Sequence, residues 1–271
     1  MLNYITWNMN PSAFHIFGIE IRWYGVLFAC AFLVGFYLLR YILKKEGKPD
    51  KLADSLLYYV LFSVIIGARL GHCLFYEPEY FLTHPLKIIT GFREGGLASH
   101  GAAIGIIVAL ILVARKYKLS FWYLVDRVVI MVAIGGFLIR TGNLFNSEIY
   151  GNVTHLPWGF IFERNHEILP KHPTQIYEGL SYLLLFFFMM WYYLKKKRQP
   201  KDGIIFGIFL IGCFGMRFLI EFVKENQEIW EDNMLLNMGQ ILSLPFVILG
   251  IVVLILGIKE KLPFQIKTQK K

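Results

Sequence analysis

The sequence predicts an all-α, polytopic membrane protein with about seven transmembrane helices and one main external segment between helices four and five. Hydrophobic residues make up 56% of the 271 residues and charged residues 17%. The mean hydropathy of +0.51 is too high for a soluble globule of this length. Runs of roughly 20 mostly apolar residues, enough to cross a ~30 Å hydrocarbon core, follow one another along the chain. We expect spans near residues 22–43, 55–76, 96–114, 120–140, 174–194, 203–222 and 236–258.

The orientation of the spans follows from the loops between them. Lysine and arginine are concentrated after the first, third and fifth expected spans and in the C-terminal tail, whereas the other loops carry few. By the positive-inside rule the N-terminus then lies outside and the C-terminus in the cytoplasm, which agrees with an odd number of spans. The stretch before the first span lacks a basic region, so we expect a retained helix rather than a cleaved signal peptide. We therefore expect a single integral membrane domain over residues 1–271, with 141–173 as its main external segment.

Composition also excludes several classes of protein. The formal net charge of +9 lies in short loops and not in a basic stripe with interleaved aromatic residues, so a nucleic-acid partner is not predicted. Cys30, Cys73 and Cys213 each fall inside an expected span and show no paired spacing. Neither a disulfide framework nor a metal site is predicted, and no cofactor motif is present.

Polar side chains inside the spans gather toward the outer face. Once orientation is assigned, the rise of ~1.5 Å per helical residue gives each of them a depth. An ionisable residue near the bilayer centre costs roughly 2.5 kcal/mol or more, so it faces a partner or a watery cavity. The residues near the outer face are Arg22, Tyr24, Arg69, His72, His100, Arg140, Gln175, Tyr177, Glu178, Arg217, Glu221 and Gln240. Together they predict a pocket for an anion at headgroup level, and phospholipid phosphate is the anion found there.

Individual members of this group also have plainer interpretations. Arg69 fits a snorkelling or helix-pairing role as well as a functional one. Interhelical hydrogen bonding is the better interpretation for His72, Glu178 and Gln240. Asp126 and Arg127 are exceptions to the pattern, because they lie about two turns in from the cytoplasmic side.

The external segment begins with a run of donors and acceptors. Just after the membrane-edge Arg140, the chain reads Thr141-Gly142-Asn143-Leu144-Phe145-Asn146-Ser147-Glu148-Ile149-Tyr150-Gly151. We expect a turn whose amide and carboxylate groups could surround a glycerol phosphate, although the same pattern also fits a helix cap followed by a loop.

Seven short segments stand in a recognisable order. They are Trp23-Tyr24-Gly25, Gly67-Ala68-Arg69-Leu70-Gly71, Gly95 to Gly101, Arg140 to Gly151, His172 to Glu178, Arg217 to Glu221 and Met238-Gly239-Gln240. In that order they resemble the bacterial prolipoprotein diacylglyceryl transferases, over nearly the whole chain. Residues 139–151 resemble the family signature G-R-x-G-N-x-x-N-x-E-x-x-G. Ile139 and Ser147 replace glycines of that family, and Cys213 stands where it often has tyrosine.

The resemblance implies an enzyme of the bacterial inner membrane. Such enzymes move the sn-1,2-diacylglyceryl group of phosphatidylglycerol to the lipobox cysteine thiol of a preprolipoprotein, forming a thioether and releasing glycerol 1-phosphate, the first step of lipoprotein maturation. The implied partners are phosphatidylglycerol, lipobox-containing preprolipoproteins and membrane lipid, and segment 141–173 becomes periplasmic. By resemblance Arg140 is the leading phosphate-binding residue, and His100 and Arg217 belong to the catalytic centre. The residues implied to shape the site are Tyr24, Asn143, Asn146, Glu148, Gly151 and Glu221.

This chemistry suits the residue types present. The nucleophile is the thiol of the protein substrate, so the enzyme needs no serine or cysteine nucleophile of its own. Arginine stays protonated and can form two parallel hydrogen bonds to phosphate, so Arg140 and Arg217 are candidates to neutralise the leaving group. A thiol of pKa about 8.5 needs a base at neutral pH. His100 is the first candidate for that base, and Glu221 either orients Arg217 one helical turn away or is itself the base.

Other membrane proteins share parts of this pattern. The main alternative is a transporter of an anionic lipid or small anion, because buried charges also mark substrate paths. An odd number of spans, the lack of an internal repeat and charges at one face rather than the midplane disfavour it. The last expected span contains no lysine for a retinal Schiff base, and no GxSxG or HExxH motif indicates a protease.

Overall fold

The computed structural model describes residues 4–91, 96, 98–225 and 234–263. The chain forms two compact units. The first unit comprises residues 1–39 and 126–262, and the second comprises residues 40–125 and 263–271. The expectation of a single membrane domain stays a prediction.

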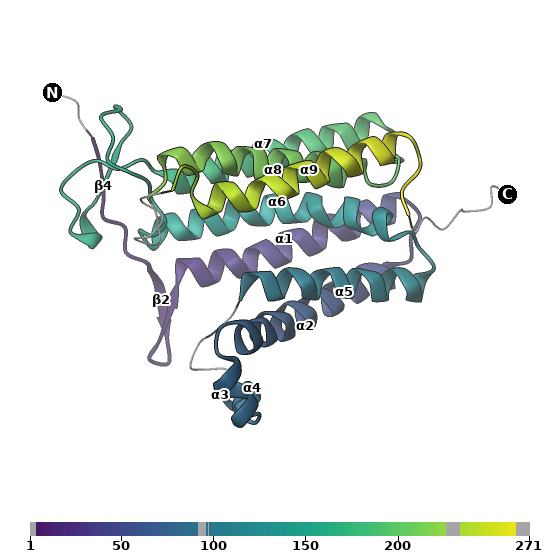
Figure 1. The fold of residues 1–271 in the computed structure, drawn as a ribbon, viewed down its shortest axis with the longest axis horizontal. Coiled ribbons are helices and arrows are strands. Elements are labelled where there is room, and N and C mark those ends of the chain that lie inside the picture. Colours follow the sequence, from purple (N-terminus) through teal and green to yellow (C-terminus); the bar gives the residue numbers. More distant parts are fainter. Residues whose placement is uncertain (1–3, 92–95, 97, 226–233, 264–271) are drawn as a thin grey trace. The chain divides into compact units, whose positions relative to one another are not determined.

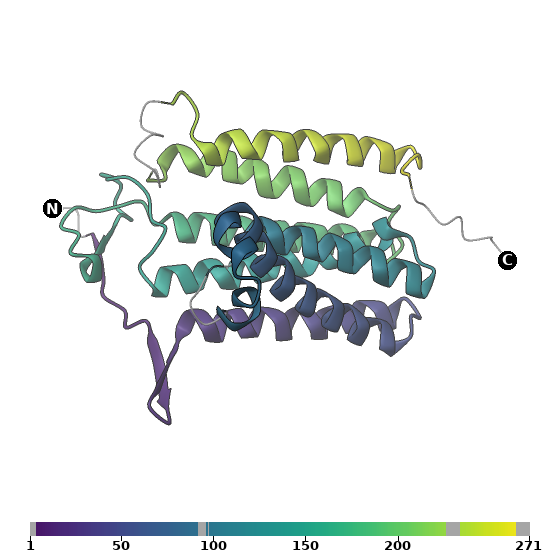
Figure 2. The same ribbon diagram turned by 60° about the horizontal axis from the view of Figure 1, so that its bottom comes forward.

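Long helices dominate the first unit. They are α1 (Trp23–Lys45) as far as residue 39, α6 (Phe121–Phe145) from residue 126, α7 (Thr174–Lys195), α8 (Ile204–Ile220) and α9 (Met238–Ile258). Helix α8 packs against both α7 and α9, and the three run side by side in Figures 1 and 2. At the far end of α8 from Arg217, the buried Asp126 carboxylate accepts hydrogen bonds from the backbone N–H groups of Gly203 and Phe206, both 2.8 Å long. Asp126, one of the two exceptions to the outer cluster, thus caps a helix of its own unit.

Four short strands in the described part of the chain correct the all-α prediction. Strand β1 (Ile5–Trp7) pairs in parallel with β4 (Phe160–Phe162), and β2 (Ser12–Ile16) forms an antiparallel hairpin with β3 (Ile19–Arg22). These strands are three to five residues long, too short for an alternating pattern to be recognised in the sequence. The β1–β4 pair also joins segments that are far apart in the chain. The Trp7 indole N–H donates to the carbonyl of Leu144 at 2.9 Å, which ties β1 to the end of α6.

The second unit is built on a close pair of helices. Helix α2 (Asp50–Phe75) packs along α5 (Ser99–Tyr117), and the short helices α3 (Pro78–Thr83) and α4 (Lys87–Thr90) follow α2. Where α2 and α5 meet, a Cβ atom on Gly101 would lie 2.2 Å from the carbonyl oxygen of Gly67. Glycines on both helices therefore allow their backbones to touch, as small residues do in membrane helix pairs.

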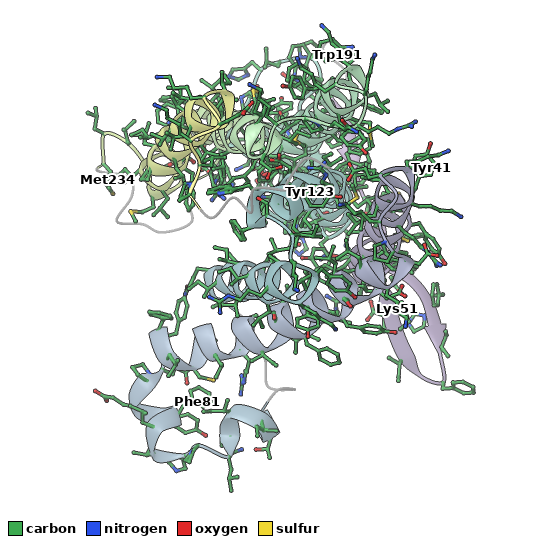
Figure 3. All side chains as sticks on the ribbon, turned by 90° about the vertical axis from the view of Figure 1, so that its right-hand side faces the viewer. Tyr41, Lys51, Phe81, Tyr123, Trp191 and Met234 are labelled. Atoms are coloured by element: carbon green, nitrogen blue, oxygen red, sulfur yellow. The ribbon has the colours of Figure 1, made fainter. Side chains whose placement is uncertain are left out.

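Arg69 has a structural role within the second unit. Its side chain is buried and donates hydrogen bonds to the carbonyls of Lys87 and Ile88, each 2.9 Å long. The guanidinium also lies 5.1 Å from the ring centre of Phe81, which is labelled in Figure 3. These contacts hold α3 and α4 against α2. They fit the helix-pairing interpretation of Arg69 better than snorkelling or a place in an anion pocket.

The expected spans correspond to helices of the structure. Among the described residues, six helices are long and apolar enough to cross a membrane. The 22-residue α7 is the seventh candidate, and its four tyrosines make it more polar. The chain is thus a polytopic membrane protein with six to seven candidate spans. Helix α6 runs to Phe145, five residues past the expected end, so the first residues of the expected external segment are helical.

Candidate functional site

The signature segment folds into a helix end and a tight turn in the first unit. The N–H of Asn146 still bonds the carbonyl of Gly142, and the N–H of Glu148 returns to the carbonyl of Asn143, both at 3.1 Å. Ser147 and Ile149 take the left-handed conformation, with φ of 55° and 61°. The turn brings the Glu148 carboxylate back to the helix, where Oε1 accepts from the amides of Asn143 and Asn146 at 2.7 and 3.3 Å. The pattern thus forms a helix end and then a turn, and the expectation that this turn surrounds a glycerol phosphate stays a prediction.

Arg140 is held by groups on two helices. Its Nε atom is ion-paired with Oε2 of Glu178 on α7, and Nη1 donates to Oδ1 of Asn143 at 3.1 Å. The side chain of Arg140 is 16% exposed and that of Glu178 is 3% exposed. Among the described residues no group is bonded to Nη2. The guanidinium is thus fixed in orientation while keeping a donor for a ligand.

Lys224 joins Glu178 to Glu221. It follows the 3-10 helix η3 (Glu221–Val223), and its ammonium lies 3.3 Å from Oε1 of Glu178 and 3.1 Å from Oε1 of Glu221. Oε1 of Glu221 also lies 3.5 Å from Nε of Arg217, one turn earlier on α8. Three cations and two carboxylates therefore alternate in one chain of ion pairs that begins at Arg140 and ends at Arg217. The positive excess, together with arginine donors at both ends, suits an anion.

Two glycines permit these approaches. A Cβ atom on Gly151 would lie 2.2 Å from the carbonyl oxygen of Val223, because Gly151 pairs with Lys224 in a β-bridge. A Cβ atom on Gly239 would lie 2.4 Å from the carboxyl carbon of Glu221. Asn237, which caps α9 in a capping box with Gln240, donates to Oε2 of Glu221 at 3.3 Å. Glu221 is therefore bonded through both carboxylate oxygens.

The remaining predicted residues divide between the two units. Tyr24, at the start of α1, packs against Gly142, and its Cδ2 atom would lie 2.9 Å from a Cβ there. Together with Arg140, Asn143, Asn146, Glu148, Gly151, Arg217 and Glu221 it belongs to the first unit. His100 lies at the start of α5 in the second unit. There its exposed ring lies 5.5 Å from that of Phe75 and 5.7 Å from that of Tyr76, so its placement beside the arginines stays a prediction.

Three residues have larger roles than the sequence predicted. Glu178 and Lys224 are central to the ion pairs, whereas the sequence suggested interhelical hydrogen bonding for the first and only a loop position for the second. The Gln175 amide, one turn before Glu178, donates to the backbone carbonyl of Glu148 at 2.6 Å. The one sequence feature that could have predicted the roles of Gln175 and Glu178 was the polar stretch His172 to Glu178 at the start of an apolar span. Gln240 meets its expectation, since Nε2 approaches the carbonyl of Phe218 at 3.5 Å.

A cavity of about 410 Å³ opens beside the turn. Its lining residues are Asn146, Ser147, Glu148, Ile149, Tyr150, Asn165, Lys224 and Glu225. Amides, carboxylates and one ammonium dominate this list, so the cavity suits a polar, hydroxyl-bearing group. No group of three or more metal-binding side chains is found within the described part of the chain.

Comparison with known proteins identifies the family. Residues 11–256 match the family model described as prolipoprotein diacylglyceryl transferase. The chain belongs to this family. It is 44% identical to the phosphatidylglycerol–prolipoprotein diacylglyceryl transferase of Tolumonas auensis, over 94% of this chain and 98% of that one. The enzyme of the same name from Porphyromonas gingivalis is 44% identical over 95% and 96%, and that from Chloroherpeton thalassium 43% identical over 95% and 96%.

Two of the positions at which this prolipoprotein diacylglyceryl transferase differs from the resemblance described above are Ser147 and Cys213. Ser147, which replaces a glycine, occupies a left-handed conformation that glycine adopts without steric cost. Cys213, where the resemblance implies a tyrosine, lies close to Tyr182 of α7. A tyrosine side chain is thus present beside this position, although it comes from a different helix.

Proposed function

We propose that this transferase moves the diacylglyceryl group of phosphatidylglycerol to the lipobox cysteine of a preprolipoprotein at the outer face of the bacterial inner membrane. The observation that carries the proposal is the pair of arginines at the two ends of one chain of ion pairs. Each guanidinium is oriented through Nε by a carboxylate, which leaves Nη donors for a phosphodiester. The relatives' shared name supplies the two substrates.

The reaction is an alkylation at carbon. The sulfur of the lipobox cysteine forms a bond to the glycerol carbon that bears the phosphate, and the bond from that carbon to the phosphodiester oxygen breaks. The bonding electrons leave with the oxygen, which departs as part of glycerol 1-phosphate. Arg140 and Arg217 stabilise the charge that develops there.

The thiol proton requires an acceptor. We assign this role to His100, because an imidazole is the side chain most often used as a general base. Glu221 is better suited to orienting Arg217, because its carboxylate is bonded to Arg217, Lys224 and Asn237. Tyr24, Asn143, Asn146, Glu148 and Gly151 shape the phosphatidylglycerol site around Arg140.

The proposed topology follows the distribution of basic loops. The N-terminus and segment 141–173 are periplasmic, and the C-terminus is cytoplasmic. Lys195 at the end of α7 lies 4.6 Å from the ring centre of Trp191, labelled in Figure 3. A tryptophan beside a lysine at a helix end is typical of a membrane interface.

Purified protein mixed with phosphatidylglycerol and a lipobox peptide tests the proposal. The peptide should gain the mass of one diacylglyceryl group, whereas a transporter would leave the peptide mass unchanged. Arg140→Ala should lower the rate by at least about 100-fold, because one oriented donor to the developing charge is worth that much. Arg115→Ala is the matched control, since Arg115 lies in the last turn of α5, is exposed, and its side chain is bonded to no group among the described residues. Equal rates for the two variants would remove Arg140 from the mechanism.

A further inference from the structure

Lys224 is among the most deeply buried charges of the structure. Its side chain is 4% exposed, compared with 37% for that of Arg217. A buried lysine persists only where its charge is compensated, and here two carboxylates compensate it. Neither carboxylate is available to it alone, because Glu178 also binds Arg140 and Glu221 also binds Arg217.

The backbone of Lys224 is fixed as firmly as its side chain. Lys224 pairs with Gly151, the last residue of the signature segment, and the N–H of Asn152 donates to the carbonyl of Val223 at 2.9 Å. The N–H of Gly151 donates to the carbonyl of His172 at 2.8 Å, two residues before α7 begins. One residue therefore connects the signature turn, the carboxylate of α7 and the carboxylate that follows α8.

We propose that Lys224 is a positioning residue that sets the separation of Arg140 and Arg217 and aligns both guanidinium groups on one phosphodiester. The inference rests on the proposed function, in which these two arginines hold the leaving group. Lys224 need not touch the lipid. Its ammonium draws the two carboxylates together, and each carboxylate holds one arginine at Nε.

The alternative is that Lys224 only stabilises the fold, and a second buried lysine separates the two interpretations. The side chain of Lys171 is 9% exposed, and its Nζ atom lies 2.5 Å from Oε1 of Glu225 and 3.6 Å from Oε2 of Glu167. It forms bridges to Val153 and Phe160, but it contacts neither Glu178 nor Glu221. Lys171→Met therefore removes a buried, paired ammonium close in sequence to the site without altering the connection between the arginines.

The experiment measures kcat and KM for phosphatidylglycerol with Lys224→Met, Lys224→Arg and Lys171→Met, using full-length protein in detergent micelles. Lys224→Met should lower kcat by about 100-fold, as a displacement of about 1 Å in the reacting geometry does. Its KM should change by less than about 3-fold, because both arginines still attract the ground-state phosphate. Lys224→Arg should recover kcat to within about 10-fold of the unaltered protein, and Lys171→Met should keep it within about 3-fold.

Three results would overturn the inference. They are a kcat of Lys224→Met within about 3-fold of the unaltered enzyme, an equal loss in Lys171→Met, and no recovery in Lys224→Arg. If Lys224→Met does not give a monodisperse protein, Lys224→Gln is held to the same thresholds. Failure of the proposed function has a different signature, because the unaltered protein would then leave the peptide mass unchanged.

Discussion

Gly151→Ala should both destabilise the protein and inactivate it. The new Cβ would lie 2.2 Å from the carbonyl oxygen of Val223 and 2.8 Å from side-chain carbons of His172 and Thr174, where ordinary contacts are 3.4–4 Å. Val223 and His172 are held by backbone hydrogen bonds to residues 151 and 152, and Thr174 follows closely, so these neighbours cannot simply turn aside. The segment around Gly151 must instead move away from them by about 1 Å. Overpacking of this kind costs about 1–3 kcal/mol.

The separation also weakens backbone hydrogen bonds. The bond from Asn152 to the carbonyl of Val223 joins the same segments, and a typical bond contributes about 1 kcal/mol. We therefore expect Gly151→Ala to lower the free energy of unfolding by about 2–4 kcal/mol. Because Lys224 moves with Val223, kcat should fall by about 100-fold even at temperatures where the variant is folded.

Gly215→Ala is the matched control. Gly215 lies within α8, and a Cβ there would meet no atom of the described residues within 4 Å. Alanine is favoured over glycine in a helix by about 0.5–1 kcal/mol, so this variant should be slightly stabilised and fully active. Unfolding followed by circular dichroism in detergent micelles, together with the peptide-mass assay, measures both effects. If the free energy of unfolding of Gly151→Ala lay within about 0.5 kcal/mol of that of the unaltered protein, the predicted clash with Val223 would be refuted.

Further predictions concern the turn, the helix cap and pH. Ser147→Gly should raise the free energy of unfolding by about 0.5–1 kcal/mol, because it removes a left-handed serine whose buried hydroxyl has no partner among the described residues; an unchanged melting temperature would contradict this. Asp126→Asn should lower the free energy of unfolding by about 2 kcal/mol, since one of two charge-assisted cap bonds is lost. Asp54→Asn should change it little, because the side chain of Asp54 is bonded to no group among the described residues. Burial lowers the pKa of His172, so the folded state binds fewer protons than the unfolded state. The associated stability is complete above pH about 6.5 and is lost as the pH falls through the lowered pKa. Melting temperatures from pH 7.5 to 5 should therefore decline less in His172→Gln, and parallel curves for the two proteins would exclude this contribution.

The sequence alone determined the membrane class and the positions of the long helices, and it predicted the residues of the site. Long apolar runs have few structural solutions in a bilayer, because every backbone polar group there must be satisfied within the helix. The order of the motifs then identified the family, and the charges near one face predicted a site shared by Arg140, Arg217, Glu221 and His100. The structure joins the first three through ion pairs, and the place of His100 stays a prediction.

Only the tertiary structure decided how these residues are connected. The parallel pairing of Ile5–Trp7 with Phe160–Phe162 depends on contacts between distant segments that no local pattern records. The roles of Glu178 and Lys224 likewise depend on which charges become neighbours once α7 and α8 pack together. Depth in the membrane follows from position along a helix, but the pairing of charges depends on how the helices are arranged around each other. For that reason the sequence indicated which charged groups the helices carry, and the packed helices showed which of them are paired.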